Sequence, residues 1–108
     1  MITTHVLDTA RGRPADGVPV VLERATPQAW EIVGTGVTDA DGRVRDLGAA
    51  PAPGRYRLTF DTEAYFRTQD VVGFYPEVTV VFTVVDAGEH HHVPLLLSPY
   101  GYSTYRGS

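Results

Sequence analysis

Histidine side chains are the groups in this sequence best suited to chemistry near neutral pH. The chain has four histidines, with His5 near the start and His90, His91 and His92 in succession. An imidazole ring titrates near neutral pH, so it can serve as a general base or, when neutral, as a metal ligand. These residues therefore indicate proton transfer or metal binding.

Metal binding is the weaker of the two interpretations. Two histidines at positions i and i+2 of a strand project from the same face, so His90 and His92 can approach one ion. A zinc site has three or four protein ligands, and without cysteine the others would have to be His5 or a carboxylate. We expect no native metal, with an adventitious ion at His90 and His92 as the alternative.

Arg43 and the C-terminal segment are the other candidates for function. A single arginine after Asp41-Gly42 is more often a solvated turn residue than a functional one. Residues 98–108 contain three tyrosines, three serines and an arginine, whereas chain ends usually fray. This composition favours a tail that docks into a site or an interface, although an edge strand packed by tyrosines would have a similar composition.

Composition restricts the class of protein. A chain of 108 residues, 43% apolar and 20% charged, matches one globular domain over residues 1–108. No apolar run approaches the roughly 20 residues that a membrane-spanning helix needs. The net charge of -4, without a block of Lys or Arg, argues against a nucleic-acid partner. Residues 1–6 lack the pattern of a secretory signal, so we expect a cytoplasmic location.

Short β-like segments separated by turn residues predict an all-β sandwich. Pro19 indicates a strand start or an edge. Residues 39–42 have the composition of a tight turn that closes a hairpin-like connection and delivers Arg43 into a short strand. One short helix is expected at residues 62–69, with Asp61 or Thr62 as its N-cap. The eight predicted strands are residues 2–8, 18–24, 30–37, 43–45, 55–61, 78–85, 90–97 and 100–106.

The period of two along a strand assigns the histidines to faces. In the predicted strand 2–8, His5 shares a face with Thr3 and Leu7. In the strand 90–97, one face is mostly aliphatic and suits a core: His91, Val93, Leu95 and Leu97. The opposite face places His92 beside apolar neighbours, which indicates a covered binding surface or an oligomer interface. A purely structural histidine is the alternative.

Several segments resemble the 5-hydroxyisourate hydrolases, the enzymatic relatives of transthyretin. The resemblance extends over the whole chain, and the terminal Tyr105-Arg106-Gly107-Ser108 is its most discriminating motif because the hormone carrier lacks that ending. The matching segments are Thr4-His5-Val6-Leu7-Asp8, Arg11-Gly12-Arg13-Pro14-Ala15, Thr38-Asp39-Ala40-Asp41-Gly42-Arg43, Asp61-Thr62-Glu63-Ala64-Tyr65-Phe66, Phe74-Tyr75-Pro76-Glu77 and residues 92–108.

The resemblance implies a transthyretin-like eight-stranded sandwich of two sheets with one short helix. It further implies a homotetramer, a dimer of dimers, with active sites in a channel at the dimer–dimer interface. The implied reaction is hydrolysis of the ring amide of 5-hydroxyisourate to 2-oxo-4-hydroxy-4-carboxy-5-ureidoimidazoline in urate degradation. No cofactor is expected.

The resemblance also implies roles for particular residues. His92, with His5, activates water, and Arg43 binds ring oxygens and stabilises the developing negative charge. Tyr105 and Ser108 supply hydrogen bonds and close the pocket, Ser108 through its hydroxyl or a terminal carboxylate; a nucleophilic serine is a rival role. Arg106 is a further substrate-binding candidate. A solvated or structural role is expected for the two remaining histidines, His90 and His91.

Two other functions compete with the hydrolase. The first is a transthyretin-like binding protein for aromatic, hormone-type ligands, against which the terminal motif at residues 105–108 argues. The second is a secreted carbohydrate- or peptide-binding module, which is disfavoured because no signal sequence is recognised and because charged residues are predicted to line the interface. Fold by itself excludes neither.

Overall fold

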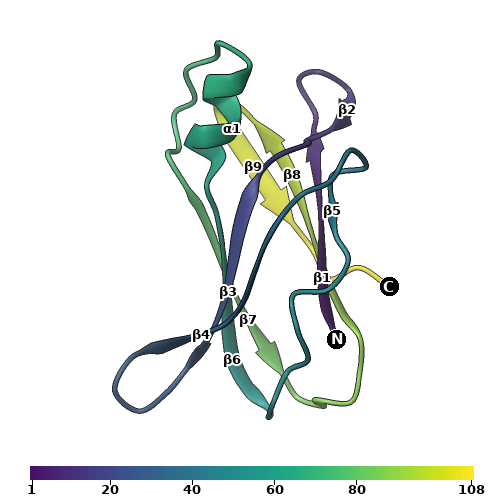
Figure 1. Cartoon of the computed structure of the whole chain (residues 1–108), viewed down its shortest axis with the longest axis vertical. Coiled ribbons are helices and arrows are strands. Elements are labelled where there is room, and N and C mark those ends of the chain that lie inside the picture. Colours follow the sequence, from purple (N-terminus) through teal and green to yellow (C-terminus); the bar gives the residue numbers. More distant parts are fainter.

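Two β-sheets pack face to face in the computed structural model, which describes all of residues 1–108 (Figure 1). The strands are β1 (Ile2–Asp8), β2 (Arg13–Pro14), β3 (Pro19–Ala25), β4 (Trp30–Val37), β5 (Arg43–Val44), β6 (Gly54–Phe60), β7 (Val78–Val84), β8 (His91–Ser98) and β9 (Gly101–Thr104). The helix α1 (Thr62–Thr68) connects β6 to β7. The predicted all-β sandwich with one short helix is therefore confirmed.

The two sheets have different strand orders. The first has the order β2-β1-β8-β9, with β5 also paired to β1, and the second has the order β4-β3-β6-β7. β1 and β8 are parallel neighbours, and every other pairing is antiparallel. The strand that carries His5 thus lies directly beside the strand that carries His92.

All eight expected strands are present, and the two-residue β2 is an addition to them. Pro19 is the first residue of β3, as a missing backbone N–H requires. The hairpin expected at residues 39–42 is wrong, because β4 and β5 belong to different sheets. The tight turn itself exists, but it carries the chain from one sheet to the other. His90 was expected within a strand and lies just before β8.

Alternation along the strands builds the core and turns the histidine-bearing faces of β1 and β8 outward. In β8 the residues His91, Val93, Leu95 and Leu97 are buried, as predicted. In β1 the buried core residues include Ile2 and Val6. The intervening side chains of both strands therefore project from the outer face of the first sheet.

The helix closes one end of the sandwich (Figure 1). Its N-cap is Asp61, whose side chain accepts a hydrogen bond of 3.0 Å from the backbone of Ala64. Tyr65 is buried, and its hydroxyl donates a 2.6 Å hydrogen bond to Asp8 Oδ2 at the end of β1. This contact joins the helix to the strand that carries His5.

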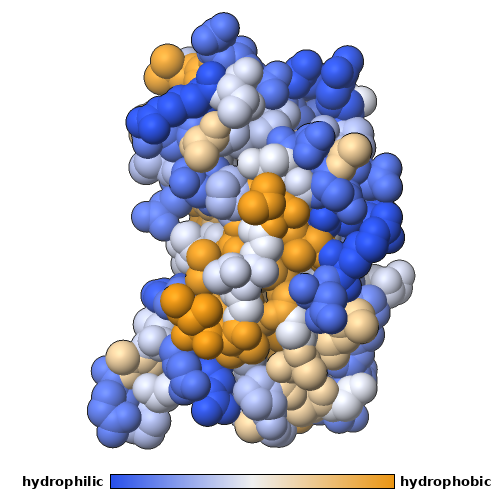
Figure 2. Space-filling view, viewed as in Figure 1, coloured by the Kyte–Doolittle hydropathy of each residue, from blue (hydrophilic) through white to orange (hydrophobic).

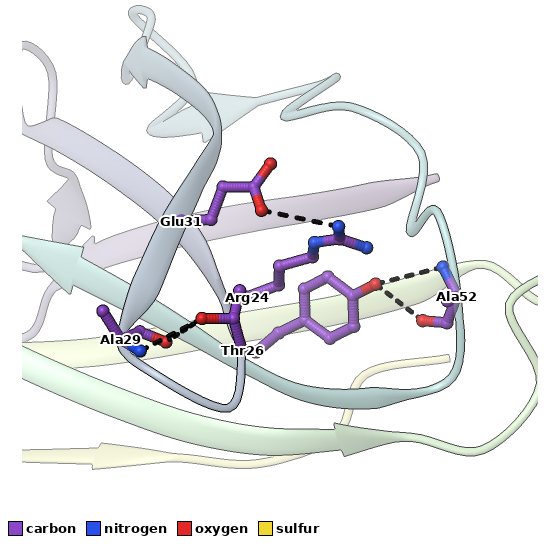
Figure 3. A network of polar contacts seen from close by, with 6 residues as sticks. Arg24, Thr26, Ala29, Glu31 and Ala52 are labelled. Carbon is purple, nitrogen blue, oxygen red and sulfur yellow. Dashed lines mark hydrogen bonds and ion pairs between the residues drawn. The ribbon is translucent and has the colours of Figure 1, made fainter.

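A polar network closes the other end (Figure 3). Arg24 of β3 reaches Glu31 of β4 at 3.4 Å. The buried Tyr56 donates a 2.6 Å hydrogen bond to the carbonyl of Ala52 and accepts a longer one of 3.3 Å from its N–H. The Tyr56 contacts hold the loop between β5 and β6 against the sandwich, and the Arg24–Glu31 pair joins β3 to β4.

Apolar surface gathers in the middle of the face seen in Figure 2, in the area that β3 and β4 occupy in Figure 1. β4 is an edge strand, and Ile32 and Val37 in it are exposed. Its Gly34 lies so close to the carbonyl of Leu47 that a Cβ there would come within 2.0 Å of the oxygen. β4 thus packs directly on the segment that follows β5, and β5 is the strand that carries Arg43.

No helix of this structure is long and apolar enough to cross a lipid bilayer.

Candidate functional site

Strand register places His5, Arg43 and His92 on the same face of the first sheet. His5 of β1 is the partner of Arg43 in β5 on one side and of Pro94 in β8 on the other. Thr3 is the partner of His92. Since paired residues project to the same side of a sheet, these side chains share its outer face. The face assignment made from the sequence is confirmed.

A rigid turn presents Arg43. Asp39 Oδ1 accepts backbone hydrogen bonds of 2.9 Å from Asp41 and 3.0 Å from Arg43. Gly42 has a φ of 75°, and a Cβ there would lie 2.4 Å from the carbonyl oxygen of Val6, so only glycine fits without displacement. The turn is therefore fastened to β1 at the level of His5.

Neighbouring charges leave the Arg43 guanidinium available for a ligand. Arg45 forms ion pairs with Asp39 at 3.6 Å and with Asp41 at 3.2 Å. Arg43 takes part in none of the ion pairs of the chain. The turn carboxylates are thus paired with the neighbouring arginine, and Arg43 is the cation free to bind an anionic or carbonyl oxygen.

An open depression of about 360 Å³ brings Arg43, His92 and Ser108 together. His5 lies beside it as the strand partner of Arg43. The complete lining consists of Met1, Thr3, Thr4, Arg43, Val44, Arg45, His90, His92 and Ser108. Only two of these residues are apolar, so the depression suits a polar ligand.

The C-terminal tail reaches this depression by crossing over His92. The backbone N–H of Gly107 donates a 2.8 Å hydrogen bond to the carbonyl of His92. A Cβ on Gly107 would come within 2.5 Å of His92 Cδ2, so the glycine backbone lies directly on the imidazole ring. This contact delivers Ser108 to the depression and limits the positions open to the His92 ring.

Tyr105 and Arg106 lie elsewhere in the single chain. They line a second cavity of about 220 Å³ with residues of β7 and β8, among them Phe82 and His92. Arg106 pairs with Glu89 at 3.3 Å. The structure thus does not bring these two predicted substrate-binding residues to Arg43 within one chain, and their roles stay predictions.

Burial and positive charge keep the two site histidines neutral. Desolvation is the main cause that lowers the pKa of His92, and the charges of Arg43, His5 and His90 lower it further. Desolvation and then Arg43 lower the pKa of His5, against smaller opposing effects from Asp41 and Asp39. A neutral imidazole near neutral pH is competent as a general base.

Two features of the site were missed in the sequence. The hydroxyl of Thr3 lies 2.8 Å from His92 Nδ1 and 2.9 Å from His90 Nε2. The alternation of the sequence had indicated only that Thr3 shares a face with His5. Gly107 was part of the terminal motif, but nothing in the sequence indicates that it covers His92.

His91 is buried and its Nδ1 lies 3.0 Å from the carbonyl of Glu89, which fits a structural role. No three His, Cys, Asp or Glu side chains are grouped to hold a metal ion.

Comparison with known proteins is consistent with this geometry. Residues 2–107 match the HIUase/Transthyretin family. The chain belongs to that family. It is 49% identical to the 5-hydroxyisourate hydrolase of Salmonella typhimurium, over 100% of this chain and 81% of that protein. It is also 49% identical to the mouse (Mus musculus) 5-hydroxyisourate hydrolase, over 99% of this chain and 94% of that protein.

Solved structures of the HIUase/Transthyretin family share the fold. The Klebsiella pneumoniae 5-hydroxyisourate hydrolase aligns with a TM-score of 0.86 at 40% identity, over 99% of this chain and 98% of that one. The sea bream transthyretin in complex with thyroxine aligns with a TM-score of 0.91 at 34% identity, over 98% of this chain and 93% of that one. Since both structures align well, the fold does not distinguish an enzyme from a carrier. The residues of the site have to make that distinction.

Proposed function

We propose that this protein is a cyclic amide hydrolase that converts 5-hydroxyisourate to 2-oxo-4-hydroxy-4-carboxy-5-ureidoimidazoline in urate degradation. The observation that carries the proposal is the convergence of His92, Arg43 and Ser108 on one polar depression, with His5 beside it. Full-length similarity to proteins named 5-hydroxyisourate hydrolase supports it independently.

His92 is the general base in the proposed mechanism, with His5 as its partner. Because His92 Nδ1 is engaged by Thr3, Nε2 is the nitrogen left for a water molecule. The lowered pKa of His92 keeps this ring neutral near pH 7. Water then adds to the ring carbonyl as its proton passes to Nε2, and a positioned base of this kind contributes roughly 10²- to 10⁴-fold.

Arg43 stabilises the oxyanion that forms when water adds. Its guanidinium has no carboxylate partner and stands at the exit of a rigid turn, so little reorganisation is needed when negative charge develops on the carbonyl oxygen. Collapse of the oxyanion then breaks the carbon–nitrogen bond of the ring. Ser108, which lines the depression, holds the substrate through its hydroxyl in this mechanism, and no covalent acyl-enzyme is required.

Assembly into a homotetramer, a dimer of dimers, is part of the proposal. β7 and β9 are edge strands, each paired on one side only, and they carry the exposed Val81 and Tyr102. Such edges and apolar side chains favour pairing with a second copy of the chain. The open depression then faces another pair of chains, whose Tyr105 and Arg106 could complete it. A sedimentation measurement that gives only a monomer at assay concentration would contradict this.

A transthyretin-like carrier of aromatic, hormone-type ligands is the alternative. The fold is compatible with this alternative, because the chain aligns over 98% of its length with the thyroxine-bound sea bream transthyretin. Arg43, His92 and Arg45 around the depression argue against it, since they would be desolvated by a bulky aromatic ligand with little compensation. The single domain over residues 1–108 and the cytoplasmic location stay predictions.

Ultraviolet absorbance of 5-hydroxyisourate, generated freshly from urate by urate oxidase, tests the proposed reaction. Accelerated loss of the substrate on addition of the protein, unchanged by EDTA, is the expected result. The matched control is the Arg43→Ala variant, which removes the oxyanion donor and leaves the core intact. If the protein binds thyroxine and does not accelerate the loss of 5-hydroxyisourate, the carrier function replaces the hydrolase function.

A further inference from the structure

The Thr3 hydroxyl connects the proposed base to a second histidine. Thr3 is 8% exposed and is held in β1 as the strand partner of His92. Its Oγ1 lies 2.8 Å from His92 Nδ1 and 2.9 Å from His90 Nε2, so both contacts have hydrogen-bond length. His92 is half-buried in the site, while His90 is exposed. The Thr3 hydroxyl therefore joins the two imidazole rings in one hydrogen-bonded chain.

A single hydroxyl proton couples the tautomers of the two rings. Thr3 can donate only one hydrogen bond, so it must accept at one imidazole while it donates to the other. If it donates to His92 Nδ1, the His92 proton is on Nε2 and this nitrogen is no base. If it accepts from His92 Nδ1–H and donates to His90 Nε2, His92 Nε2 has a free lone pair.

Positive charge favours the second arrangement. Arg43 lines the same depression as His92. A lone pair on Nε2 is attracted by a guanidinium, whereas an N–H pointing toward it is repelled. His5 from β1 and His90 also act on the pKa of His92, and Arg45 and Met1 line the same depression. None of these four groups supplies a negative charge that would favour the opposite tautomer.

Hydrolysis leaves a proton that has to leave the site. Of the two protons of the attacking water, one goes to His92 Nε2 and the other ends on the nitrogen released from the ring. The product has a carboxyl group, which is ionised near neutral pH, and a ureido group, which is not basic. One proton therefore stays on the His92 imidazolium after each turnover and must be lost before the next.

We propose that Thr3 is a positioning residue that accepts a hydrogen bond from His92 Nδ1–H and donates one to His90 Nε2, which keeps His92 Nε2 unprotonated before each turnover. Nε2 accepts the proton of the attacking water and afterwards returns it to solvent through the open depression, while Nδ1 keeps its proton and its hydrogen bond to Thr3. The His92 ring therefore ends each turnover in the tautomer in which it began. This role rests on the proposed hydrolase function.

Nitrogen-15 NMR of the histidine rings tests the positioning without any turnover. In the free protein near neutral pH, His92 is expected to be protonated at Nδ1. In Thr3→Val, which keeps the shape and removes the hydroxyl, the signal should shift toward a mixture of tautomers. Thr3→Ser should restore the original signal. Protonation of His92 at Nε2 in the unmodified protein would overturn the proposal.

Kinetics test the positioning during turnover. Thr3→Val is expected to lower kcat about tenfold with KM nearly unchanged, as the loss of one orienting hydrogen bond predicts. Thr3→Ser should restore kcat. The matched control is Thr59→Val, on β6 in the other sheet, for which unchanged kinetics are expected.

The outcomes separate this inference from the proposed function. An unchanged kcat in Thr3→Val, with the protein folded by circular dichroism, would overturn the role of Thr3 in turnover. If the unmodified protein does not hydrolyse 5-hydroxyisourate and His92 is nevertheless protonated at Nδ1, the hydrolase fails while the positioning by Thr3 is supported. If the unmodified protein hydrolyses 5-hydroxyisourate and His92 is protonated at Nε2, the hydrolase function is supported and the positioning by Thr3 is rejected.

Discussion

Replacement of Gly107 by alanine is expected to lower turnover while the protein stays folded. The added Cβ would lie 2.5 Å from His92 Cδ2, 3.2 Å from His92 Cγ and 3.3 Å from Pro94 Cγ. Carbon atoms in favourable contact are about 3.5–4.0 Å apart, so the tail or the ring must move by about 1 Å. A misplacement of about 1 Å at a catalytic group can cost roughly 100-fold in rate, or about 2.7 kcal/mol.

The assay for Gly107→Ala is kcat/KM for 5-hydroxyisourate, followed by absorbance, together with the thermal unfolding midpoint. Overpacking costs about 1–3 kcal/mol of stability, which a folded domain can tolerate. Gly101→Ala is the matched control, because the nearest atom to its Cβ is Ser98 Oγ at an ordinary 3.7 Å. If both variants turn over substrate at the original rate, contact with the tail does not control His92, and the reasoning is refuted.

Four further results are expected. Arg43→Ala should lower kcat by about 10²- to 10³-fold, with unchanged mass by gel filtration, because it removes an oxyanion donor from a turn outside the core; full activity would remove Arg43 from the site. The acidic limb of kcat/KM should lie below pH 6.5, because the pKa of His92 is lowered from that value and the neutral base persists to lower pH, and Arg43→Gln should move the limb toward higher pH; a limb above pH 6.5 would argue against His92 as the base. Deletion of residues 106–108 should impair turnover at an unchanged unfolding midpoint, whereas an unaltered rate would leave the tail a packing role. Tyr65→Phe should lower the free energy of unfolding by about 1–3 kcal/mol in urea titrations, since the buried carboxylate of Asp8 loses its 2.6 Å donor; no change would show that solvent replaces the donor.

Local patterns in the sequence were sufficient to predict most of the fold. The strands follow from period-two alternation, and the core face of β8 could be read directly from the aliphatic residues that alternate with His92. The helix could be placed because Asp61 or Thr62 can serve as its N-cap and because Gly73 and Pro76 end it; Asp61 is the N-cap in the structure. These features depend on neighbours along the chain, which is why the sequence carries them.

The connection at residues 39–42 shows where local reasoning ends. Its Asp and Gly residues specify a tight turn, and that turn is present. Whether the flanking strands pair depends on which sheet each one joins, and this is decided by the contact of β4 with Leu47 and of β5 with β1. The prediction of a hairpin was therefore wrong, although the delivery of Arg43 into a short strand was right.

The site divides in the same way between chain-local and tertiary information. Residue type and strand parity were enough to select His5 and His92 as a pair on one face, since side chains alternate across any strand. The Thr3 hydroxyl contacts two histidines that are 87 and 89 residues away in the chain, and the backbone of Gly107 lies on the His92 ring. The pairing of strands in the folded sheet creates both contacts. Contacts of that kind depend on the order of strands in the folded sheet, a property that no local stretch of sequence contains.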